Sequence, residues 1–142
     1  MAIRGHPGQG CIVICDYSEG FVEPEMVKRR PAIVLCPGIR ARSGLCTIVA
    51  LSTTPPEQKM PYHCEVKLPF NLPPPFNSET AWIKGDMVNA VGFHRLDLVR
   101  LGKDQNGKRR YLLEPVGSDI LLRARQCVLH GIGLSTLTKG LK

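Results

Sequence analysis

Short apolar runs rich in β-branched residues recur along the chain and predict a protein built mainly of strands. Four such runs are separated by Gly, Pro or polar stretches and cover residues 10–17, 31–37, 44–52 and 62–68. Two shorter pieces follow at 80–83 and 86–91, and the Gly85 between them predicts a bend or bulge. Many closely spaced strands of this kind favour a small, curled antiparallel sheet.

The last third of the chain predicts a hairpin. Asn106-Gly107 is typical of a type I′ turn and is expected to join residues 95–101 to residues 109–116. The apolar residues then change to helical spacing, which predicts one helix over about 118–132 with Ser118 as its N-cap.

These elements predict one domain over residues 1–142, mainly β with a C-terminal helix. The tail, residues 134–142, carries no recognisable chemistry and is expected to be flexible.

The charge balance favours a polyanionic partner. The 142 residues carry a formal net charge of +7, and eleven of the nineteen cations are Arg, whose planar fork suits phosphate. We find no signal peptide and no apolar run of membrane-spanning length, so we expect a cytoplasmic protein without a membrane partner. Its six cysteines are expected to be reduced, and four of them, Cys11, Cys15, Cys36 and Cys46, lie in apolar runs and are expected to act as small apolar side chains. The absence of a CxxC pair predicts no metal site.

Residues that could carry chemistry gather around the second and third predicted strands. Three cations, Lys28, Arg29 and Arg30, precede one strand, and the hydroxyls Ser52, Thr53 and Thr54 follow the next. An antiparallel pairing would bring Arg30 and Thr53 to one edge, where a guanidinium and hydroxyls suit an oxyanion.

Further polar candidates lie later in the chain, and each taken singly is more often structural. They are His63, Glu65, Lys84, Asp86, His94 and Arg95. Cys64 beside His63 could suggest a cysteine nucleophile, but neighbours on a strand point to opposite faces. The chain has no phosphate-binding Gly-rich loop and no HExxH or GxSxG motif.

Four stretches in order resemble the MazF/PemK-like toxins of bacterial toxin-antitoxin pairs, and within them the YifN-like branch. They are GQGCIVICDY, EMVKRRPAIVL, TIVALST and KMPYHCEV, followed by the C-terminal helix. The resemblance implies a small SH3-like antiparallel barrel, a homodimer, and metal-independent, sequence-specific cleavage of single-stranded RNA without a cofactor. It also implies an acidic antitoxin protein as a possible partner.

The resemblance assigns roles to individual residues. Arg30 matches the Arg that acts on the reacting phosphate, and Thr53 matches the hydroxyl residue that ends the third strand. Glu25 matches an acidic residue of the first loop, while Lys84 and Asp86 match a basic-x-Asp pair used for acid-base work. Contacts to RNA are expected from Lys28, Arg29, Ser52, Thr54, His63 and Asn89.

Two functions therefore stay open from the sequence. The first is a toxin-type endoribonuclease in which the ribose 2′-OH attacks the adjacent phosphate. The alternative is a catalytically inactive module on the same fold that binds nucleic acid or protein.

Overall fold

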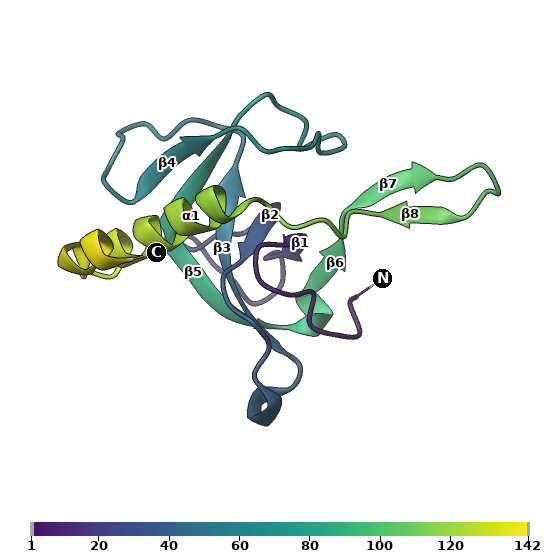
Figure 1. Ribbon diagram of the computed structural model, residues 1–142, viewed down its shortest axis with the longest axis horizontal. Coiled ribbons are helices and arrows are strands. Elements are labelled where there is room, and N and C mark those ends of the chain that lie inside the picture. Colours follow the sequence, from purple (N-terminus) through teal and green to yellow (C-terminus); the bar gives the residue numbers. More distant parts are fainter. Residues whose placement is uncertain (1, 142) are drawn as a thin grey trace.

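The computed structural model describes residues 2–141 and shows a curled six-stranded antiparallel sheet with a helix on one face (Figure 1). In chain order its strands are β1 (Ile12–Asp16), β2 (Arg29–Val34), β3 (Leu45–Ser52), β4 (His63–Val66), β5 (Ala81–Gly92) and β6 (Leu96–Leu98). Their spatial order is β4-β5-β3-β2-β1-β6. The predicted fold class is confirmed, although β4 and β6 end the sheet as separate edges and do not close it into a barrel.

A two-stranded hairpin projects from the body beyond β6 (Figure 1). It consists of β7 (Arg100–Lys103) and β8 (Arg109–Tyr111). The hairpin was predicted with the wrong turn type, because a type I′ turn needs positive φ at two residues and Asn106 does not have it. Instead the Asp104 carboxylate accepts the backbone N–H groups of Asn106 and Lys108, and between Asp104 and Lys108 only Gly107 has a positive φ, of 77°.

The longest helical elements follow this hairpin in the C-terminal part of the chain. Helix α1 (Ser118–Gly131) is capped by Gly117, not by Ser118 as predicted, and no side chain bonds to its first turn. Residues expected to be a flexible tail include a 3₁₀ helix, η3 (Ser135–Gly140). Two short 3₁₀ turns occur within the β region, η1 (Arg40–Arg42) and η2 (Phe93–Arg95). No helix among residues 2–141 is long and apolar enough to cross a membrane.

Alternation along the strands gives the sheet two buried faces. On one face, side chains such as Ile14, Ile33 and Val49 pack under α1. On the other, Val13, Cys15, Ala32 and Ile48 form a second cluster, against which Phe21 and Met26 of the first loop pack. Every central strand is therefore covered on both sides, which explains why the strand sequences are nearly continuous apolar runs.

A bulge in β5 fixes where the helix lies on the sheet. β5 pairs with β3 as one long strand, but the register jumps from Ala50↔Lys84 to Val49↔Val88. Residues 85–87 are therefore extra, as the glycine predicted. Gly85 lies against the backbone of Cys127 in α1, and a Cβ at Gly131 would come within 2.6 Å of the Gly85 carbonyl oxygen. Helix and strand thus approach at a point where neither has room for a side chain.

The six cysteines are all free thiols. Burial raises the pKa of Cys15 to about 11 and that of Cys46 and Cys127 to about 12. These three thiols stay protonated at neutral pH and pack as apolar side chains.

Gly85→Ala should destabilise the fold by at least about 2 kcal/mol, because the new Cβ would overlap the Cys127 carbonyl and force helix and strand apart. Urea denaturation followed by circular dichroism measures the loss. Gly5→Ala is the matched control, because a Cβ at Gly5 meets nothing within 4 Å. Equal stability of the two variants would contradict the close contact.

Candidate functional site

Cross-strand register brings polar residues of four strands to one end of the sheet face opposite α1. β2 and β3 pair with Ala32↔Ala50, which sets Arg30 beside Ser52. Ser52 lies opposite Trp82, and Trp82 lies opposite Glu65. One row further along, Ala50 is opposite Lys84, and Lys84 is opposite His63. We call this set, Arg30, Ser52, Glu65, Trp82, His63 and Lys84, the polar row.

Arg30 is held in place through the hydroxyl of Ser52. Its Nη1 donates to Ser52 Oγ at 3.4 Å, and Ser52 Oγ also accepts the backbone N–H of Thr54 at 3.1 Å. The same hydroxyl donates to the Thr54 carbonyl oxygen at 3.3 Å, so its hydrogen-bonding capacity is full. Ser52 is the one polar or charged residue classed as buried within residues 2–141, at 3% exposure. It therefore ties the guanidinium to the turn that ends β3.

Ser52, not Thr53, is thus the hydroxyl beside Arg30. Thr53 and Thr54 lie beyond the last residue of β3, and both are exposed. This difference from expectation follows from register, because only even-numbered residues of β3 share a face with Arg30. The Thr53 and Thr54 side chains remain available to solvent at the same edge.

The Arg30 guanidinium still has unused hydrogen-bonding capacity. Its Nε is buried and has no hydrogen-bond partner among residues 2–141. Buried donors in native proteins are nearly always paired, so an orphan beside a surface hollow is a feature expected of a ligand site. The hollow itself is lined by Glu23, Pro24, Glu25, Met26, Val27, Lys28 and Arg30.

Tyr17 lies behind this site on the same face. It is fully buried, and burial and the neighbouring Cys15 thiol raise its pKa, while the charge of Arg30 acts in the opposite direction. The Tyr17 hydroxyl makes no hydrogen bond to a nitrogen or oxygen within residues 2–141. Cys15 is opposite Arg30 in the register, so the cross-strand neighbour of Arg30 on β1 is a buried thiol.

The first loop, residues 18–28, is held down by an aromatic and cationic stack. Phe21 packs edge-on against Tyr17 with ring centroids 5.2 Å apart, and the Arg95 guanidinium lies 4.7 Å above the Phe21 ring. Arg95 Nη1 also donates to the Glu19 carbonyl oxygen at 2.6 Å. Arg95, a candidate from the sequence, therefore positions the loop that carries Glu25.

Glu25 lines the same hollow as Arg30. Its Oε2 accepts the backbone N–H of Val22 at 2.8 Å, which closes a turn within the loop. Lys28 lines this hollow too and is exposed.

Lys84, Asp86 and His63 form a second charged group on β4 and β5. His63 Nδ1 accepts the backbone N–H of Met60 at 3.0 Å. Partial burial lowers the pKa of His63, Asp86 acts to raise it, and Lys84 acts to lower it further. Asp86 is exposed within the bulge. Lys84 is diagonal to Ser52, so this group adjoins the Arg30 group along the polar row.

Three expected site residues lie elsewhere. Arg29 occupies the opposite face of β2, where its Nη2 pairs with Asp97 Oδ2 at 3.3 Å. Asn89 is opposite Ile48, on the far side of the bulge from Lys84. His94 is exposed in η2. The structure therefore does not bring these three to Arg30.

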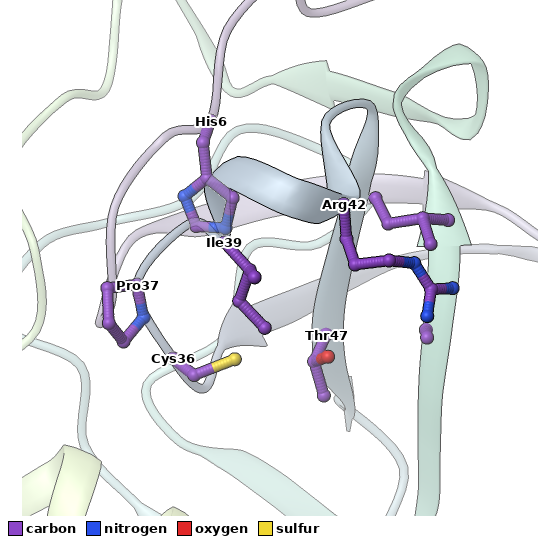
Figure 2. Close-up of a pocket in the computed structure, with 8 residues that line it drawn as sticks. His6, Cys36, Pro37, Ile39, Arg42 and Thr47 are labelled. Carbon is purple, nitrogen blue, oxygen red and sulfur yellow. The ribbon is translucent and has the colours of Figure 1, made fainter.

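A separate small pocket of about 130 Å³ lies near the N-terminal segment (Figure 2). His6, Cys36 and Ile39 line it on one side, and Arg42 and Thr47 on the other (Figure 2). It contains none of the predicted site residues. Within residues 2–141, no group of three or more His, Cys, Asp or Glu side chains is placed to hold a metal ion.

Sequence reasoning missed Tyr17, Phe21 and Trp82. Alternation along residues 10–17 could have found Tyr17, because it shares a face with the cysteine opposite Arg30. The Phe21–Arg95 contact joins residues 74 positions apart and left no signal in the local pattern.

The curled antiparallel sheet gives the class of fold, and Arg30 and Ser52 lie side by side at the ends of β2 and β3 that meet at one edge of it. The family described as "PemK-like, MazF-like toxin of type II toxin-antitoxin system" matches residues 8–113. The chain belongs to this family, and the predicted membership is confirmed.

Relatives of similar length support the branch. The chain is 27% identical to YifN of Escherichia coli (strain K12), with 96% of this chain and 99% of that protein covered. It is also 27% identical to an uncharacterized protein of Haemophilus influenzae, with 96% and 98% covered.

Solved structures share the fold at lower identity. MazF from Deinococcus radiodurans aligns with a TM-score of 0.60 at 18% identity, over 92% of this chain and 99% of that one. An endoribonuclease in complex with its cognate antitoxin, from a mycobacterial species, aligns with a TM-score of 0.54 at 18% identity, over 91% and 97%.

His63 should titrate below its ordinary range in the folded protein, because burial penalises the imidazolium and protonation would remove the Nδ1 acceptor used by Met60. The unfolded chain then binds more protons, so stability should fall as pH drops from about 6.5 through the folded pKa. NMR titration of the imidazole measures the pKa, and unfolding at pH 7 and pH 5 measures the consequence. His63→Asn, which keeps an acceptor, should show a smaller decline; an identical decline would contradict the assignment.

Proposed function

We propose that this protein is a toxin-type endoribonuclease that cleaves single-stranded RNA without a metal ion, by attack of a ribose 2′-OH on the adjacent phosphate. The observation that carries the proposal is Arg30, whose half-buried guanidinium is fixed by Ser52, has a buried Nε without a partner and belongs to a side chain that lines a hollow. Preorganised donors of this kind stabilise charge that develops in a transition state. Family membership supplies the reaction class.

We assign Arg30 to stabilising the negative charge of the phosphorane that forms during cleavage. Its position is set by the hydrogen bond to Ser52 and by its neighbour Cys15 before substrate binds, so little reorganisation of the protein is needed during the reaction. Thr53, exposed at the same edge, holds a phosphate oxygen through its hydroxyl. Ser52 acts through Arg30 as a positioning residue, because its own hydrogen bonds are already used.

A base must accept the 2′-OH proton, and the family pattern offers two carboxylates for this role. Asp86, exposed in the bulge beside Lys84 and His63, is the first assignment from the family pattern. Glu25 has the support of a hollow shared with Arg30. Lys84 adds positive charge diagonal to Ser52. Lys28, Thr54, His63 and Asn89 are assigned to RNA contacts, with Asn89 at the far end of the face, whereas the buried Ser52 is not.

The partners proposed with this function are single-stranded RNA, a second copy of the chain and an acidic antitoxin protein. Two structural relatives are described as complexes with an antitoxin, one mycobacterial and one the MazE-MazF pair of Deinococcus radiodurans. The net charge of +7 suits both RNA and an acidic protein.

Cleavage of a pool of single-stranded RNA by the purified protein tests the proposal. The alternative, an inactive binding module, predicts retention of RNA without product. The Arg30→Ala variant, purified in the same way, controls for contaminating nucleases.

Arg30→Ala should reduce cleavage by at least about 10²- to 10³-fold, because it removes the fixed donor to the phosphorane. Single-turnover rates on one RNA substrate measure the effect, and circular dichroism checks the fold. Lys67→Ala, which removes an exposed cation just beyond β4, should leave the rate unchanged. A folded Arg30→Ala protein with the normal rate would refute the central assignment.

The products should carry a 2′,3′-cyclic phosphate and a 5′-OH, and cleavage should continue in EDTA, because the substrate itself supplies the nucleophile. Substrates lacking the 2′-OH at the cut site, DNA or 2′-O-methyl RNA, should resist. Mass spectrometry of the fragments decides between mechanisms. A 5′-phosphate product, or activity that EDTA removes and magnesium restores, would contradict this mechanism.

A further inference from the structure

A second basic surface lies on the opposite face of the molecule from the polar row. It is a groove between the N-terminal segment, the end of β2 and the projecting β7–β8 hairpin. Its lining residues are Ala2, Ile3, Arg4, Arg29, Asp97, Leu98, Arg100, Arg109 and Tyr111. Four of these nine residues are Arg and one is acidic.

The walls of the groove are held by backbone pairing. On one side the Ile3 N–H donates to the Leu96 carbonyl oxygen at 2.9 Å, and Ala2 bridges to Asp97, which places Arg4 beside β6. On the other side Arg100 is directly opposite Tyr111 in the hairpin. Arg109 is two residues from Tyr111 on β8, so the three side chains share one face of the hairpin.

Asp97 offsets only part of the positive charge. It pairs with Arg29 at 3.3 Å, and both side chains are partly exposed. Arg4, Arg100 and Arg109 remain as cations from three separate segments along the groove. The hairpin adds to their field, since residues 100–111 carry five cations against Asp104 alone.

We infer that this groove, which we call the hairpin groove, binds a single-stranded nucleic acid through its phosphates, at a site separate from the Arg30 hollow. Cations from several segments match an anion with repeated charges better than a single small anion. Tyr111 is 38% exposed beside them and offers a ring on which an unpaired base can stack. An exposed aromatic ring among arginines favours a nucleic acid over an acidic peptide.

Self-association is a poor alternative for this groove. In a two-fold dimer the same patch meets itself, so four arginines would face four arginines. Such like-charge contacts oppose association.

The inference rests on the proposed function only in the choice of RNA as ligand. Arg29 and Arg30 are consecutive on β2 and point to opposite faces, so one strand end serves both sites. A nucleic-acid strand held in the hairpin groove would therefore lie on the other face of β2 from the polar row and would leave that row free.

Fluorescence anisotropy with a labelled 2′-O-methyl RNA 12-mer tests the groove, because this probe binds without being cleaved. Arg100→Ala/Arg109→Ala should weaken binding at least about tenfold and reduce the salt slope by about 1.4, the value for two phosphate contacts to a single strand. Tyr111→Ala should weaken it at least about fivefold, and Tyr111→Phe should not.

The matched control is Lys108→Ala/Arg110→Ala, which removes the same charge from residues of the same hairpin that do not line the groove. Equal losses in the two double variants would show that charge alone matters and would overturn the groove. Tighter binding of a poly-glutamate peptide than of the RNA at equal charge would also overturn it, in favour of an acidic protein.

The two proposals fail separately. Arg30→Ala should lose cleavage and keep binding of the probe to the groove. Binding that depends on Arg100 and Arg109 in a protein that cleaves no RNA would remove the proposed catalytic function and leave the groove. If the protein cleaves RNA but its two double variants bind the probe equally well, the groove would be refuted and the proposed catalytic function would stand.

Discussion

The contact between Gly85 and helix α1 is the constraint on which the arrangement of both faces depends. Gly85 lies against the backbone of Cys127, and Gly131 lies against Gly85, so helix and strand meet without intervening side chains. The bulge at residues 85–87 provides this approach and divides β5 into two registers. Before the bulge, Lys84 shares a face with Ser52; after it, Val88 packs under the helix. One local irregularity thus sets the helix position and the end of the polar row.

Strand alternation then divides the run of three cations between two surfaces. Arg30 lies on the face opposite α1, half-buried against Ser52, while Arg29 pairs with Asp97 on the other face. Adjacent charges that would repel each other in an unfolded chain are separated by the strand itself. A basic stretch that forms one cluster in the sequence therefore contributes to two separate surfaces, with different neighbours and different degrees of burial.

The fold was largely predictable, because its strands are continuous apolar runs ended by Gly and Pro. The helix, predicted at about 118–132, is found at Ser118–Gly131, because its apolar residues repeat with helical spacing. Register was not predictable to one residue, and that is why Ser52 and not Thr53 lies beside Arg30. The turn of the β7–β8 hairpin also escaped prediction, because the Asp104 side chain stabilises a different geometry from the one that Asn106-Gly107 favours.

The least predictable part of the site is the environment that surrounds Arg30. Its charge and its strand could be read from the sequence, but its burial depends on Cys15 across the sheet and on a first loop held by Phe21 and Arg95. An exposed guanidinium must give up bound water when it binds a phosphate. A half-buried one with an unpaired Nε has already lost part of that water, so binding an oxyanion displaces less of it. Among the arginines that the structure describes, Arg30 is distinguished by a buried Nε without a hydrogen-bond partner and not by its charge.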